Sequence, residues 1–190
     1  MKRLSITVGA ATLALLAAQG ASAHVGIGGA GLGAGFAHPF LGLDHVLAMV
    51  AVGLWAAQSG GRAMWAVPAT FVTMLAGGAL LAIAGVNVPS VETGIAVSVL
   101  VLGLLVALAV RLPLAAGMVL TAAFAVFHGH SHGTEMPAMI SPALYAAGFL
   151  VATALLHLAG VALGRGIAAN RLRIAGACVA LAGAWMVVGG

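Results

Sequence analysis

The sequence predicts an all-α integral membrane protein, in which a cleavable signal peptide precedes a six-helix transmembrane bundle. The 190-residue chain is 63% hydrophobic and only 5% charged, whereas soluble domains carry about 25% charged residues. Its N-terminus has the layout of a secretory signal. Six later apolar segments each approach the length of a membrane span. Lipid must therefore solvate most of the surface of this chain.

Composition also excludes two classes of partner. The formal net charge of +4 includes seven basic residues, but these are scattered, whereas nucleic-acid binding needs a basic patch or stripe. No glycine-rich phosphate-binding loop is visible, so we expect no nucleotide partner and no ATP-driven step. The one cysteine, Cys178, cannot form an intrachain disulfide and says nothing about the redox compartment.

The first 23 residues form the expected signal peptide. Basic residues follow Met1 directly, an apolar run covers 4–18, and 21–23 supplies small residues where a signal peptidase cleaves. The alternative is an uncleaved first transmembrane helix, but the apolar run is short for a span of about 20 residues. Cleavage would leave residues 24–190 as one six-span transport domain that begins at His24.

Six apolar segments predict the six transmembrane helices. A helix rises about 1.5 Å per residue, so roughly 20 residues cross the hydrocarbon of a bilayer. Backbone groups in lipid must be satisfied internally, which a helix achieves. The fourth segment is the shortest, and we expect it to continue into the histidine-rich stretch that follows. The segments cover residues 40–57, 63–84, 93–110, 114–127, 142–163 and 174–188.

The arginines predict the orientation of these spans. With the mature N-terminus outside, the first, third and fifth loops are cytoplasmic, where Lys and Arg are enriched. The outer loops hold Glu92 and Glu135 and no basic residue. Six spans then return the C-terminus to the outer side. The five arginines beyond the signal peptide all lie in the three cytoplasmic loops: Arg62, Arg111, Arg165, Arg171 and Arg173.

A first group of polar side chains opens the first span, and polar groups at membrane depth are costly enough to suggest function. The group contains His38, Asp44 and His45. Pro39 suits the first turn of a helix, which would make His38 its N-cap residue. His45 would then lie about two turns into the helix, beside Asp44. The alternative is a structural ion pair between Asp44 and His45 that fixes the first helix.

A second polar group closes the fourth span, where the chain reads FHGHSHGTE. If the helix continues through it, His128 and His132 share one face at i and i+4, and Glu135 follows at i+7. Gly129 and Gly133 would otherwise unwind the helix and free backbone carbonyls as ligands. The alternative to a functional group is a solvated loop that binds metal only incidentally.

The two groups together predict one outward-facing metal site, because the orientation derived from the arginines places both at the outer face. Imidazole suits nickel, copper and zinc, and the added carboxylates argue against a purely soft-metal site. The expected metal ligands are His38, Asp44, His45, His128, His130, His132 and Glu135.

Two further histidines stand apart from these groups. At the mature N-terminus, His24 would combine its imidazole with a free α-amine and form an N-terminal ligand. His157 lies deep in the fifth span, about 22 Å below the outer face at helical rise. It would relay metal inward or, alternatively, form a neutral core histidine that is hydrogen-bonded to a neighbouring helix.

Both polar groups resemble the signatures of a known family. The string HPFLGLDH at 38–45, followed by Met49 and VGLWA at 52–56, resembles one signature of the HupE/UreJ family, and FHGHSHGTE at 127–135 resembles its second. A weaker match surrounds His157. The resemblance covers the chain from about residue 24 to its end. It implies the motif residues His38, Asp44, His45, His128 and Glu135, with His130 and His132 in the matching string.

The resemblance implies a function, because HupE/UreJ proteins are bacterial nickel, sometimes cobalt, permeases that serve hydrogenase or urease maturation. We therefore expect a non-enzymatic inner-membrane protein with periplasmic termini that takes up Ni²⁺ or Co²⁺ by facilitated diffusion. The metal is the substrate, no permanent cofactor is expected, and the partners are the divalent ion and membrane lipid. The sequence leaves a homo-oligomer open. The alternative function is an intramembrane zinc-dependent hydrolase that uses the same His, Asp and Glu side chains.

Overall fold

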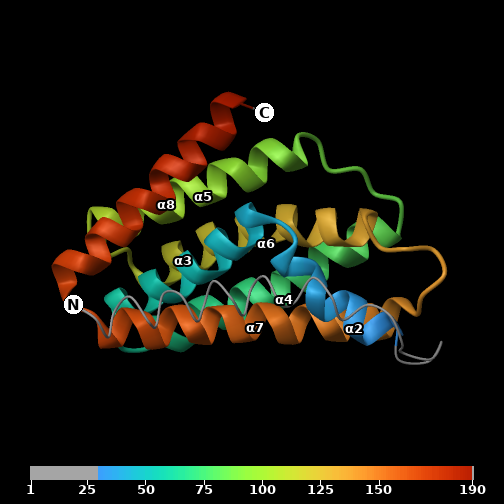
Figure 1. The fold of residues 1–190 in the computed structure, drawn as a ribbon, viewed down its shortest axis with the longest axis horizontal. Coiled ribbons are helices and arrows are strands. Elements are labelled where there is room, and N and C mark those ends of the chain that lie inside the picture. Colours follow the sequence, from blue (N-terminus) through green and yellow to red (C-terminus); the bar gives the residue numbers. More distant parts are fainter. Residues whose placement is uncertain (1–29, 190) are drawn as a thin grey trace, which may run out of the picture. The chain divides into compact units, whose positions relative to one another are not determined.

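The computed structural model describes residues 30–189, which contain helices and no strand. The expected signal peptide and His24 lie outside the described residues. The chain divides into two units, Met1–Ala30 and Gly31–Gly190, and the description below concerns the second. The elements are α2 (Ala30–Ala37), the 3-10 helix η2 (His38–Phe40), α3 (Leu43–Ser59), α4 (Ala63–Ile83), α5 (Val91–Ala107), α6 (Leu114–Thr134), α7 (Pro142–Gly166) and α8 (Ala169–Gly189) (Figure 1).

Each of the six predicted apolar segments coincides with one helix. Of these, α4, α6, α7 and α8 are long and apolar enough to cross a membrane, whereas α3 and α5 have 17 residues each. α3 reaches the length of a span only together with the preceding segment Gly31–Phe40, and the two are bent by 80° relative to each other. Residues 30–189 thus form an all-α structure with four helices that can span a membrane. A bundle of six spans remains a prediction.

The start of the first predicted span is wrong in detail. We expected a helix from residue 40 with His38 as its N-cap, but His38–Phe40 form a single 3-10 turn and α3 begins at Leu43. Gly42 has extended backbone angles (φ −105°, ψ 120°), so no helix runs through it. Pro39 disfavours the helical conformation in the residue before it, which is consistent with a short turn here. His38 therefore lies on a different element from His45.

The fourth segment continues as predicted. α6 is one helix as far as Thr134, so His128 and His132 lie one turn apart on the same helix. Unwinding at Gly129 and Gly133, the alternative, does not occur. The alternative, in which these glycines free backbone carbonyls as metal ligands, is therefore wrong.

Glycines bring the principal helix pairs close together; these pairs are α4 with α6, α5 with α8, and α3 with α7 (Figure 1). A Cβ atom at Gly129 would collide with the carbonyl oxygen of Leu75 on α4. On α7, a Cβ atom at Gly160 would lie 2.9 Å from the Cα atom of Gly53 on α3. In lipid no hydrophobic effect drives helices together, so close backbone packing has to join them. This requirement explains why α6 keeps its glycines without unwinding.

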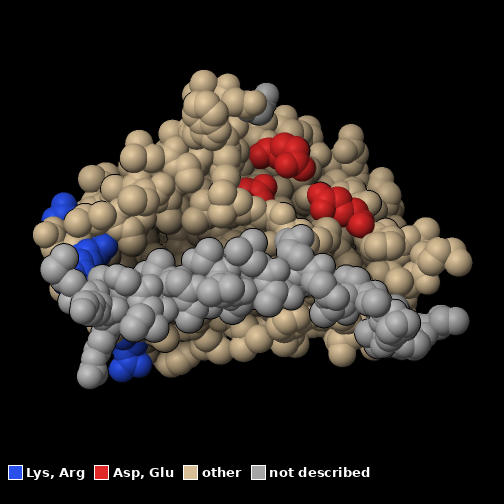
Figure 2. Space-filling view, viewed as in Figure 1, with Lys and Arg blue, Asp and Glu red and all other residues tan. Residues whose placement is uncertain are grey.

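The described charges are segregated along the helices. The five arginines lie where α3, α5 and α7 end and where α4, α6 and α8 begin. The three acidic residues lie at the other ends: Asp44 in the first turn of α3, Glu92 in the first turn of α5, and Glu135 directly after α6. On the face that Figure 2 shows, basic and acidic side chains are likewise apart. We call these the arginine end and the acidic end.

Candidate metal site

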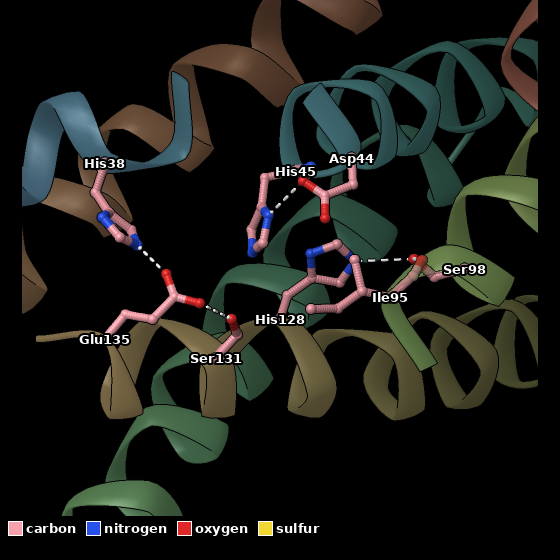
Figure 3. Close-up of polar contacts among 8 residues, drawn as sticks. All are labelled: His38, Asp44, His45, Ile95, Ser98, His128, Ser131 and Glu135. Atoms are coloured by element: carbon pink, nitrogen blue, oxygen red, sulfur yellow. Dashed lines mark hydrogen bonds and ion pairs between the residues drawn. The ribbon is translucent and has the colours of Figure 1, made fainter. Parts of the chain in front are cut away.

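His45 and Asp44 form a pair at the start of α3. Oδ1 of Asp44 accepts hydrogen bonds from the backbone N–H of His45 at 2.7 Å and from its ring Nδ1 at 2.9 Å (Figure 3). A carboxylate can only accept, so Nδ1 of His45 carries a proton, and in the neutral ring the lone pair is on Nε2. Nε2 is buried and has no hydrogen-bond partner among the described residues. The pair therefore presents an unprotonated nitrogen that a metal could bind.

His128 has its proton position set in the same way by Ser98 of α5. The Ser98 hydroxyl donates to the carbonyl oxygen of Ile95 at 2.6 Å, and its Oγ lies 2.8 Å from Nε2 of His128 (Figure 3). Because the single hydroxyl hydrogen is used on Ile95, Oγ accepts from Nε2–H, and the lone pair of His128 is on Nδ1. Within the described residues, this buried Nδ1 has no partner either.

Four of the predicted histidines lie in ring contact. The centroid of His45 is 4.8 Å from that of His128 and 4.6 Å from that of His132. His38 of η2 contacts His132 at a centroid distance of 4.9 Å. His132 also stacks on Phe149 of α7 at 5.0 Å, and both of its ring nitrogens are buried without a partner in residues 30–189. η2, α3 and α6 thus bring side chains together that are about 90 residues apart in the sequence.

Glu135 joins these rings at their more exposed edge. Its Oε2 lies 3.0 Å from Nε2 of His38, and its Oε1 accepts a hydrogen bond from Oγ of Ser131 at 2.6 Å (Figure 3). The Glu135 side chain is 49% exposed, whereas His128 is fully buried. The group therefore extends from the surface into the core. We call it the histidine cluster; its members are His38, Asp44, His45, His128, His132 and Glu135.

The histidine cluster offers imidazole and carboxylate groups, a combination that nickel, copper and zinc accept. In residues 30–189, no three His, Cys, Asp or Glu side chains already have the geometry of a metal site. The rings meet edge to face or tilted, with centroids 4.6–4.9 Å apart. An ion bound by several of them would require the rings to rotate.

Comparisons with known proteins agree with the resemblance seen in the two motifs. The family profile described as HupE / UreJ protein matches residues 12–186 of the chain. The chain belongs to the HupE/UreJ family. Protein HupE of Rhizobium leguminosarum bv. viciae is 49% identical over 197 residues, which cover 100% of both chains. No solved structure matches the chain.

The HupE/UreJ family is a family of nickel and cobalt transporters. Membership agrees with a non-enzymatic role. The four helices of residues 30–189 that are able to span a bilayer agree with a multi-pass membrane protein of this family. Membership does not favour the alternative of a zinc-dependent hydrolase.

The remaining predicted histidines of this HupE/UreJ protein have other surroundings. Nε2 of His130 donates to the carbonyl oxygen of Val86, 2.9 Å away in the connection after α4. His157 is 1% exposed and contacts the ring of Phe71 at a centroid distance of 5.0 Å. Neither of its ring nitrogens has a hydrogen-bond partner in residues 30–189, so it is not the hydrogen-bonded core histidine of our alternative. Metal binding by His24 and His130 remains a prediction.

Sequence reasoning missed two residues beside the histidine cluster. Ser98 determines which ring nitrogen of His128 is protonated. A lone serine within an apolar span is unusual enough to have marked Ser98 as a candidate from the sequence. Glu92 was used only to orient the spans, but with Asp44 it lines a hollow of about 280 Å³ at the acidic end. Nothing in the spacing of Glu92 from the two motifs indicates that it lies there.

Proposed function

We propose that this HupE/UreJ protein takes up Ni²⁺, with Co²⁺ as a second cargo, across the bacterial inner membrane by facilitated diffusion. Its membership of a nickel and cobalt transporter family supports the proposal. The ion is the substrate, and no resident cofactor, nucleotide or nucleic acid takes part. Hydrogenase or urease maturation would consume the metal inside the cell.

One observation carries the proposal: two histidines from different helices hold unpartnered lone pairs beside a carboxylate. Nε2 of His45 and Nδ1 of His128 are both buried without a hydrogen-bond partner among the described residues, and the two rings are in contact. A buried polar group that lacks a partner costs about 1–3 kcal/mol. A metal ion bound to both nitrogens would remove that cost, and the charge of Asp44 would stabilise the ion.

The other members of the histidine cluster suggest the order of capture. His38 and Glu135 lie at the more exposed edge and would meet the ion first. His132 contacts both His38 and His45, so it would pass the ion from one to the other. A transport site must bind strongly enough to admit an ion and weakly enough to release it.

We further propose that the acidic end faces the periplasm and the arginine end the cytoplasm. In this arrangement the six helices all span the membrane, both termini are periplasmic, and residues 1–23 are removed as a signal peptide. An inside-negative potential of 100 mV is worth about 2.3 kcal/mol per charge, or roughly 4.6 kcal/mol for a divalent cation. Uptake would then run down the electrochemical gradient without a coupling ion.

Radioactive nickel uptake into proteoliposomes tests this function. The purified full-length protein is reconstituted, and an inside-negative potential is imposed with a potassium gradient and valinomycin. We expect uptake that exceeds that of protein-free liposomes, rises with the potential and is inhibited by excess Co²⁺. Protein that binds Ni²⁺ but carries none into the lumen would contradict the proposal.

A further inference from the structure

The face of α7 that points into the core continues the histidine cluster toward the arginine end. Tyr145, Phe149, Thr153 and His157 recur at every fourth residue, so they lie along one face of the helix, and their exposed fractions are 2%, 1%, 0% and 1%. Phe149 stacks on His132 of the histidine cluster. His157 lies about 12 Å farther along α7, at about 1.5 Å per residue.

The hydroxyl of Tyr145 and, farther along this face, the side chains of Thr153 and His157 have no hydrogen-bond partner among the described residues. Oγ1 of Thr153 and both ring nitrogens of His157 are buried without a hydrogen bond to any described residue. The two residues are four apart on one helix, which places their Cβ atoms about 5–6 Å from each other. Buried polar groups are nearly always hydrogen-bonded. Three unsatisfied atoms within one turn therefore point to a ligand.

The ring of Phe71 separates this place from the histidine cluster. Its centroid lies 5.6 Å from that of His128 and 5.0 Å from that of His157. Phe71 is itself fully buried on α4. An ion that leaves His128 would therefore pass along the Phe71 ring before it reaches His157, and the face of an aromatic ring attracts cations.

His157 also lines a hollow that leads away from the cluster. The hollow has a volume of about 380 Å³ and lies between α4 and α7. Met64 and Pro68, from the first turns of α4, line it as well, so it extends toward the arginine end. Proline has no N–H, so the carbonyl of Met64 lacks the helical donor that residue 68 would otherwise provide.

We propose that His157 and Thr153 form a second, inner binding site for the transported divalent metal, reached from the histidine cluster past the ring of Phe71. The inference rests on the proposed transport function, which it extends inward. One imidazole and one neutral hydroxyl make a weaker site than the histidine cluster with its two carboxylates. Weak binding at the last site before the cytoplasm favours release of the ion.

Equilibrium dialysis against ⁶³Ni²⁺ tests the inner site separately from transport. In full-length His128→Ala, which weakens the histidine cluster, residual Ni²⁺ binding should persist and should be lost when His157→Gln is added. Loss of an outer-sphere partner alone costs about 10- to 100-fold in metal affinity, so the loss of His157 should lower residual affinity at least tenfold. Equal residual binding with and without His157→Gln would overturn the proposal.

Uptake by Thr153→Val provides the second test, because valine keeps the shape of threonine and removes only the hydroxyl. We expect Thr153→Val to reduce proteoliposome uptake without lowering thermal stability, since its hydroxyl makes no hydrogen bond within the described residues. The matched control is Thr121→Val, where an equally buried hydroxyl donates to the carbonyl of Gly117 on its own helix. It should keep normal uptake.

The outcomes separate the two proposals. Wild-type uptake rates in both Thr153→Val and His157→Gln would overturn the inner site and leave the proposed function intact. If wild-type protein carries no Ni²⁺ into the lumen, the proposed function fails, whereas the dialysis experiment still decides whether His157 binds metal.

Discussion

Ser98 offers the sharpest test of how the histidine cluster is organised. Its Oγ accepts the proton of Nε2 on His128 at 2.8 Å because its own hydrogen is held by Ile95 at 2.6 Å. In Ser98→Ala this buried N–H loses its acceptor, at a cost of about 1–3 kcal/mol. The ring can avoid that cost by moving its proton to Nδ1, but the lone pair is then no longer on the nitrogen that faces His45 (Figure 3).

The expected loss of Ni²⁺ affinity follows from this cost. Since 1.4 kcal/mol corresponds to tenfold in a binding constant, 1–3 kcal/mol predicts a loss of about 5- to 150-fold, close to the usual effect of outer-sphere partners. Isothermal titration of purified Ser98→Ala with Ni²⁺ measures it, with Thr121→Val as the control for loss of a buried hydroxyl. Unchanged affinity in Ser98→Ala would refute the assignment of the His128 lone pair to Nδ1.

Three further predictions follow from particular contacts. Gly78→Ala should lower the Tm in detergent because the new Cβ atom would collide with the carbonyl oxygen of Val126. The control is Gly77→Ala, which should keep the wild-type Tm because no atom of the described residues beyond its own helix lies within 4 Å of the new Cβ atom. Equal Tm values for the two variants would contradict this packing. Glu135→Gln should raise the KM of uptake more than it lowers the maximal rate, because its pair with His38 lies at the exposed edge; an unchanged KM would exclude a role in capture. Burial lowers the pKa of His38 from its ordinary value of about 6.5, and imidazole must be neutral to bind metal. Uptake should therefore fall only at a pH below about 6.5; a rate that stays constant down to about pH 4 would contradict imidazole ligation.

The sequence predicted those features that depend on composition and local spacing. Six apolar segments coincide with six helices, and the charges segregate as expected. The spacing of His128 and His132 placed both on one face of α6, where they contact His45. These results need only the period of a helix and its polar positions.

Features that depend on contacts between distant segments could not be predicted. Ser98 lies 30 residues before His128, and no local pattern joins them. Gly129 could serve either to unwind α6 or to let it approach α4, and only the position of α4 decides between these. His130 follows His128 by two residues, about 200° around a helix, so a continuous helix turns it away toward Val86. His130 was expected among the ligands because it belongs to the string FHGHSHGTE, and local spacing could not show which way its side chain points.

The central claim is that Ni²⁺ crosses the membrane through the histidine cluster. The most direct test compares potential-driven ⁶³Ni²⁺ uptake by wild-type proteoliposomes with that of Asp44→Ala and His128→Ala, using Gly77→Ala as the control for substitution. We expect both cluster variants to lose uptake while they remain folded, and the control to transport normally. Uptake at the wild-type rate by a folded Asp44→Ala or His128→Ala protein would show that the metal takes another path.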